Sequence, residues 1–115
     1  MIKSYAAYEV RESLRPFSYV PRELGELDVE ITISHCGICH SDIHLINNDW
    51  GISQYPLVPG HEIVGTITAV GKKVTQVSLG DRAGVGWQCG SCFECDDCTH
   101  GDENLCASSH ATCVG

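Results

Sequence analysis

Apolar and polar residues alternate along residues 27–34, which read Leu-Asp-Val-Glu-Ile-Thr-Ile-Ser. This period of two predicts a strand with one buried and one polar face. The residues expected on the buried face are Leu27, Val29, Ile31 and Ile33. Residues 62–70 are rich in β-branched side chains and run into Gly-Lys-Lys, so they predict a second strand that ends in a turn.

Three weaker patterns complete this β-rich picture. Residues 2–10 predict a less regular strand, and a turn at 79–82 leads into a short strand over 83–87. The best helix candidate is brief: Ser41 or Asp42 is expected to cap one or two turns that end near Asn47-Asn48.

Residues 88–106 show no hydrophobic periodicity, so apolar packing cannot order them. The chain as a whole therefore predicts a mainly β, antiparallel fold with a cysteine-rich excursion.

Length and charge narrow the classes of protein. The 115 residues, 43% of them apolar, suit one compact domain. Seven Lys and Arg against 15 Asp and Glu give a formal charge of −8, which excludes a nucleic-acid binder built on basic patches. No apolar run approaches the roughly 20 residues of a membrane span, and the N-terminus lacks the apolar segment of a signal peptide. We therefore expect a cytoplasmic protein that binds neither nucleic acid nor membrane.

The eight cysteines cluster rather than spread along the chain. A C-x2-C-x2-C-x7-C pattern predicts four thiolates around one centre, which suits tetrahedral zinc and leaves no open coordination position. Such a site is structural, and its metal supplies the order that residues 88–107 lack otherwise. The predicted ligands of this lobe are Cys92, Cys95, Cys98 and Cys106.

Other interpretations of this lobe stay open at this point. Disulfides fit poorly with a cytoplasmic chain, and a redox C-x-x-C normally opens a helix in a βαβ unit, which the pattern lacks. An iron–sulfur cluster is a further alternative. Cys89 allows the register 89-92-95, which leaves Cys98 unused. The acidic residues between 94 and 103 are interpreted as a solvated face.

Two further segments carry metal-ligand residue types: Cys36-Gly-Ile-Cys39-His-Ser-Asp-Ile-His44, and Pro-Gly-His61-Glu62. Each is a weak signal on its own. Cys36 and Cys39 are equally compatible with a pair of cysteines in an apolar pocket, and His61 with an ordinary hydrogen-bonded histidine.

Together with the segment Asn48-Asp-Trp-Gly-Ile-Ser-Gln-Tyr-Pro-Leu-Val-Pro-Gly-His-Glu and the four-cysteine lobe, these motifs closely resemble zinc-dependent medium-chain alcohol dehydrogenases. The cinnamyl alcohol dehydrogenase branch and its bacterial aldehyde-reductase relatives look most similar. Three motifs occur in the family's order over nearly the whole chain. The resemblance implies a GroES-like catalytic domain, here a partial β-barrel, and reversible oxidation of a primary alcohol to an aldehyde by hydride transfer.

The resemblance also assigns roles at a catalytic zinc. Cys39 and His61 match two of the family's three protein ligands, and Glu62 matches a carboxylate that approaches the metal during ligand exchange. Asp42 matches the acid that orients the liganding histidine. Ser41 and His44 match a hydroxyl-to-imidazole relay that carries the alcohol proton to solvent.

The resemblance also implies a cofactor-binding position and a substrate-pocket position. His40 lies where many relatives place a basic residue near the cofactor pyrophosphate. Trp50 matches a substrate-pocket position, although packing is an alternative, and Cys36 matches a common non-ligand of the motif.

The chain also departs from the family pattern. It has no match for the family's third catalytic zinc ligand, a downstream cysteine, and no G-x-G-x-x-G follows a strand. We therefore expect residues 1–115 to be an incomplete catalytic domain, inactive alone, with NADP or NAD bound by the missing domain. The parent is expected to be a homodimer, and open strand edges to favour self-association of the fragment. The alternative is a stand-alone zinc-binding or interaction module.

Overall fold

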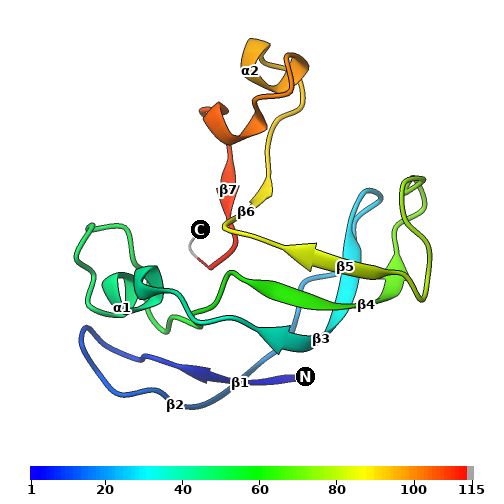
Figure 1. The fold of residues 1–115 in the computed structure, drawn as a ribbon. Coiled ribbons are helices and arrows are strands. Elements are labelled where there is room, and N and C mark those ends of the chain that lie inside the picture. The colour runs from blue at the N-terminus through cyan, green and yellow to red at the C-terminus, as the bar shows by residue number, and fades with distance from the viewer. Residues whose placement is uncertain (114–115) are drawn as a thin grey trace.

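A computed structural model describes residues 1–113 of the chain. Its largest sheet is antiparallel, in the order β3-β4-β5, with β3 over Val29–Cys36, β4 over Ile63–Val70 and β5 over Arg82–Val85 (Figure 1). The strands expected at 27–34 and 62–70 are thus confirmed. The first begins and ends two residues later than expected, because an irregularity between Ile33 and His35 lets the pairing with β4 continue to Cys36.

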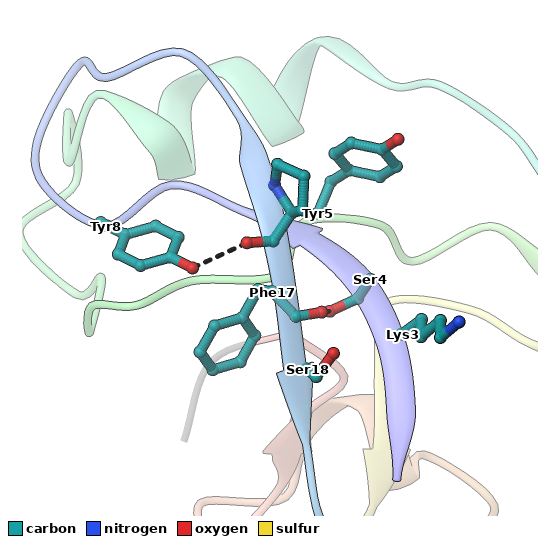
Figure 2. Close-up of a pocket in the computed structure, with 7 residues that line it drawn as sticks. Lys3, Ser4, Tyr5, Tyr8, Phe17 and Ser18 are labelled. Atoms are coloured by element: carbon teal, nitrogen blue, oxygen red, sulfur yellow. Dashed lines mark hydrogen bonds between the residues drawn. The ribbon is translucent and has the colours of Figure 1, made fainter.

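The N-terminus forms a separate antiparallel hairpin. Strand β1 spans Ile2–Ala6 and pairs with β2, Arg15–Tyr19. The expected strand over 2–10 is therefore too long, and β2 was missed because Pro16 and Arg15 interrupt any alternation. Figure 2 shows a shallow surface pocket on this hairpin, where the Tyr8 hydroxyl donates a 2.7 Å hydrogen bond to the Pro16 carbonyl.

Within residues 1–113, one helix is longer than a single turn: α1, which spans His40–Ile46. Its N-cap is Cys39, so the expected cap at Ser41 or Asp42 is wrong. Asp42 instead occupies the third helical position, and its carboxylate accepts a 3.2 Å hydrogen bond from the Cys39 backbone N–H, half of a capping box. The helix ends at Ile46 with Asn47 as its C-cap, close to the expected end at Asn47-Asn48.

Residues 88–111 form a lobe that projects away from the sheet (Figure 1). A short ribbon of β6 (Gln88–Gly90) and β7 (His110–Ala111) forms its base. A one-turn helix α2 (Asp96–Thr99) and a 3-10 turn η1 (Glu103–Leu105) lie at its tip. These elements were not expected from the pattern, because cysteine side chains rather than an apolar face hold them together. The strand expected at 83–87 ends at Val85 instead.

The apolar core is small, and its members come from the N-terminal hairpin, α1, the loop before β4, β4 and the lobe. Its largest fully buried side chains are Leu45, Leu57 and Ile67. The face expected to be buried on β3 is instead largely open: Leu27 is 71% exposed and Ile33 is 56% exposed. A hollow of about 510 Å³ lies over these residues, so the described part of the chain does not cover this side of the sheet. No helix among residues 1–113 is long and apolar enough to cross a membrane.

Candidate functional site

The four cysteines of the lobe converge on one point. Their sulfur atoms all lie within 4.8 Å of one another. The Cys92 sulfur is 3.8 Å from that of Cys98 and 3.6 Å from that of Cys106. Four sulfurs bonded to zinc at about 2.3 Å in a tetrahedron are about 3.8 Å apart, so the lobe has the dimensions of a tetrahedral thiolate site.

Backbone N–H groups in the lobe point at two of these sulfurs. Cys92 accepts from the N–H groups of Glu94 and Cys95, at 3.4 and 3.3 Å, and Cys95 accepts from that of Cys98 at 3.5 Å. These donors lower the pKa of Cys92 to about 6. The Cys98 N–H also favours a Cys95 thiolate, but the Cys98 thiol, burial and the other two thiols outweigh it and raise the pKa of Cys95 to about 12. The geometry thus favours the thiolate form at Cys92.

A second cluster lies where α1 meets the start of β4. The ligand atoms of Cys39, His61 and Glu62 also lie within 4.8 Å of one another. His61 is 6% exposed, while Glu62 is open to solvent. The Ser41 hydroxyl and N–H, followed by the His61 ring, lower the pKa of the Cys39 thiol. The site therefore combines a soft thiolate, an imidazole and a carboxylate, a donor set that suits zinc.

Asp42 organises this second cluster from behind. It is only 8% exposed, and its Oδ1 lies 3.0 Å from His61 Nδ1. The same oxygen accepts from the Gly60 N–H at 3.2 Å, while Oδ2 accepts from the Cys39 N–H. A proton on Nδ1 of His61 then leaves Nε2 free to bind a metal. The Asp42 carboxylate thus fixes the tautomer of His61, and its hydrogen bonds to the Cys39 and Gly60 N–H groups hold the two chain segments that carry Cys39 and His61.

The other residues implied by the resemblance lie along α1 and the loop after it. The structure has no hydrogen bond between Ser41 and His44, which both belong to the described part of the chain. Instead, His44 Nδ1 lies 2.8 Å from Asp49 Oδ2. His40, at the start of α1, is exposed, and its ring centroid is 4.8 Å from that of His44. Trp50 is 48% exposed and its ring lies 5.1 Å from His44.

Trp87 is a site residue that the sequence analysis missed. Its ring meets that of His61 edge-on at 5.0 Å and that of Trp50 at 6.2 Å, so it closes an aromatic wall between the second cluster and α1. The expected strand over 83–87 contained Trp87, but nothing in the local pattern indicated that β5 ends at Val85 or that this ring lies against His61.

The remaining cysteines stand outside both clusters. Cys89 is exposed, and its thiol faces the Ala111 carbonyl at 3.7 Å, so the geometry does not favour the 89-92-95 register. Cys36 is exposed at the end of β3. Burial and the charge of Asp42 raise the pKa of Cys113. All eight cysteines are free thiols in the structure, so disulfides do not order the lobe.

Comparison with known proteins decides the family. The model of the alcohol dehydrogenase GroES-like domain matches residues 25–115. The chain belongs to this family. The aldehyde reductase AdhA of Synechocystis is 54% identical over all 115 residues, and cinnamyl alcohol dehydrogenase 8 of Arabidopsis thaliana is 56% identical over 99 residues. These matches confirm the resemblance inferred from the motifs.

Solved structures confirm the GroES-like fold as well. A cinnamyl alcohol dehydrogenase from Sorghum bicolor superimposes with a TM-score of 0.92 at 44% identity, over 96% of this chain and 31% of that one. The enzyme named CAD from Helicobacter pylori, complexed with NADP(H), gives 0.92 at 39% identity, over 96% of this chain and 32% of that one. The chain spans 34% of the Synechocystis reductase and 28% of the Arabidopsis enzyme, so it corresponds to about a third of its relatives.

Proposed function

We propose that this chain is the N-terminal part of the catalytic domain of a zinc-dependent, NAD(P)-linked alcohol dehydrogenase or aldehyde reductase. The observation that carries the proposal is the convergence of Cys39, His61 and Glu62, with Asp42 bonded to the far side of the imidazole. A buried histidine oriented by a buried carboxylate beside a thiol is the usual arrangement of a zinc ligand with its supporting group. Domain boundaries of 1–115, with a structural-zinc lobe over 88–107, belong to the same proposal.

In this proposal the four-cysteine lobe holds a structural zinc ion. Support comes from the sulfur separations of 3.6 and 3.8 Å and from the N–H groups that face Cys92 and Cys95. Cys98 and Cys106 are buried, at 6% and 5% exposure, so protein atoms cover this side of the centre. Four protein ligands leave no position for a substrate, which limits this centre to stabilising the lobe.

The second cluster is proposed to be the catalytic centre. When bound, zinc polarises an alcohol or carbonyl oxygen, and the nicotinamide of NAD(P) exchanges the hydride. Cys39 and His61 would hold the metal, and Asp42 would keep His61 in the tautomer that presents Nε2. Glu62, which is exposed at the edge of the cluster, is free to approach and leave the metal position.

Proton transfer is assigned to α1. The Ser41 hydroxyl would receive the alcohol proton and His44 would pass it to solvent. The 2.8 Å contact between His44 Nδ1 and Asp49 supports a fixed ring, with Nε2 as the free nitrogen. His40 is proposed to contact the cofactor pyrophosphate, and its exposure at the start of α1 leaves it accessible.

The proposed substrate is a small alcohol or aldehyde. The relatives named as aldehyde reductase and cinnamyl alcohol dehydrogenase support this class. Trp50, and Trp87 beside it, would form the apolar wall of the substrate pocket, since both rings adjoin the second cluster. NADP is favoured over NAD because one structural relative is described as a complex with NADP(H).

Assembly and location form the last part of this proposal. The whole enzyme is proposed to be a cytoplasmic homodimer, and the 115-residue chain to be inactive alone and to associate through the open edges of its sheets. The clustering of the cysteines at metal-ligand spacing, rather than as a disulfide framework, supports a reducing compartment. The uncovered apolar face of β3 supports self-association.

Zinc content per chain tests the proposal. Plasma mass spectrometry of the purified chain should find two zinc ions, with one lost in His61→Ala and the other in Cys98→Ser. One zinc ion that His61→Ala leaves in place would instead support a stand-alone zinc module, whose only metal centre is the lobe.

A further inference from the structure

We propose that Gly37 is a positioning residue for the metal site: its missing side chain creates the space through which the Glu62 carboxylate reaches Cys39 and His61. This inference rests on the proposed catalytic zinc centre and assigns a role to a residue that coordinates nothing. A Cβ atom at position 37 would lie 2.3 Å from Glu62 Oε2, 3.1 Å from Glu62 Cβ and 3.3 Å from Glu62 Cδ.

The backbone conformation of Gly37 does not explain the glycine. The glycines with positive φ are Gly51, Gly60, Gly80 and Gly101. Gly37 is not among them, so an L-residue fits its φ without strain. Space is therefore the property that glycine supplies here.

The collision falls on one side chain only. All three of the nearest atoms to a Cβ at position 37 belong to Glu62. By contrast, a Cβ at Gly65 would meet the Thr32 carbonyl oxygen at 2.2 Å, and backbone cannot rotate aside. An alanine at 37 thus leaves room for the fold but not for the observed position of the Glu62 carboxylate.

A hydrogen bond holds the two backbones together next to this contact. The Gly37 N–H donates a 2.9 Å hydrogen bond to the Glu62 carbonyl, directly after the pairing of Cys36 with Ile63 at the end of the β3–β4 ladder. Rotation of the Glu62 side chain relieves the contacts of Oε2 and Cδ, whereas the 3.1 Å contact of Glu62 Cβ needs only a shift of a few tenths of an ångström. Rotation takes the carboxylate out of the group of ligand atoms that lie within 4.8 Å of one another.

Gly37→Ala therefore moves a charged group away from the metal without changing any charge. Competition with a chromophoric chelator measures the zinc affinity of the second site in the full 115-residue chain. We expect Gly37→Ala to weaken that affinity about 10-fold, the size of effect seen when groups that support a metal ligand are lost. Gly86→Ala is the matched control, because a Cβ there has nothing within 4 Å; its affinity should stay within about twofold of the wild type.

Removal of the Glu62 side chain tests whether the effect of Gly37→Ala depends on the Glu62 carboxylate. In a Glu62→Ala background, Gly37→Ala should change the zinc affinity by less than about twofold, because no carboxylate remains to be displaced. An equal loss with and without the Glu62 side chain would overturn the inference, as would a wild-type affinity in Gly37→Ala itself. Unfolding of Gly37→Ala that Glu62→Ala relieves would support the collision, whereas unfolding in both backgrounds would overturn it.

A wild-type chain with only the lobe zinc would refute the proposed function, and a two-zinc chain insensitive to Gly37→Ala would refute this inference alone.

Discussion

Replacement of Asp42 by alanine probes the group that joins the two halves of the second cluster. Asp42 is 8% exposed and accepts from three donors: the Cys39 N–H at 3.2 Å, the Gly60 N–H at 3.2 Å and His61 Nδ1 at 3.0 Å. Each donor loses its partner in Asp42→Ala. At about 1 kcal/mol for each, the free energy of unfolding falls by about 3 kcal/mol.

Replacement of Asp42 by asparagine should remove only part of this free energy of unfolding. In Asp42→Asn the remaining oxygen can still accept from Gly60 and His61, but the new amide cannot accept from the Cys39 N–H. We expect a loss of about 1–2 kcal/mol, since one donor is left unpaired. Because His61 loses its anionic partner in both variants, zinc affinity at this site should fall about 10- to 100-fold.

Urea unfolding followed by circular dichroism, at one fixed zinc concentration, measures the stability, and chelator competition measures the affinity. Asp81→Asn is the matched control, because Asp81 accepts a single backbone hydrogen bond, from Ser78, in an exposed turn. It should cost less than about 1 kcal/mol and leave zinc affinity unchanged. The reasoning is refuted if Asp42→Ala unfolds within about 0.5 kcal/mol of the wild type, the range of ordinary surface substitutions.

Three further predictions concern the lobe and the tryptophans. Cys98→Ser should make residues 91–106 sensitive to limited proteolysis while the β-sheet circular dichroism signal persists; a protected lobe would contradict a metal-ordered one. In a rapid reaction started as zinc is removed, before the lobe loses its order, Cys92 should be the first lobe thiol alkylated by iodoacetamide, with a rate that rises with pH through about 6, because the thiolate forms above its pKa. A midpoint near the pKa of an ordinary exposed thiol would contradict the role of the N–H donors. Cobalt binding should quench tryptophan fluorescence, and Trp87→Phe should remove more of that quenching than Trp50→Phe, because the Trp87 ring lies 5.0 Å from His61; equal losses would place the metal elsewhere.

The strands of the main sheet could be predicted well because their periodicity is local. Residues 62–70 lie within one residue of β4, since β-branched side chains and a following Gly-Lys-Lys turn define both ends. The burial of β3 could not be predicted, because alternation only indicates which side chains share a face. Whether Ile33 is covered depends on residues far away in the chain, and it is 56% exposed here.

The proposed metal-ligand positions could be predicted from the sequence, but the geometry that supports them could not. The spacing of Cys92, Cys95, Cys98 and Cys106 contains the constraint that gathers them, because short C-x2-C turns act locally. The approach of Cys39 to His61 depends on tertiary structure, through Asp42 and the end of the β3–β4 ladder. Trp87 and Gly37 escaped notice for the same reason: their partners, His61 and Glu62, are more than 20 residues away in the sequence.

Two metal centres in one small domain are the central claim, and an anomalous difference map at the zinc absorption edge tests it most directly. We expect two peaks per chain in crystals of the zinc-loaded protein, one among the four lobe sulfurs and one bonded to Cys39 Sγ and His61 Nε2. A single peak in the lobe, with the space between Cys39 and His61 empty at saturating zinc, would contradict the account.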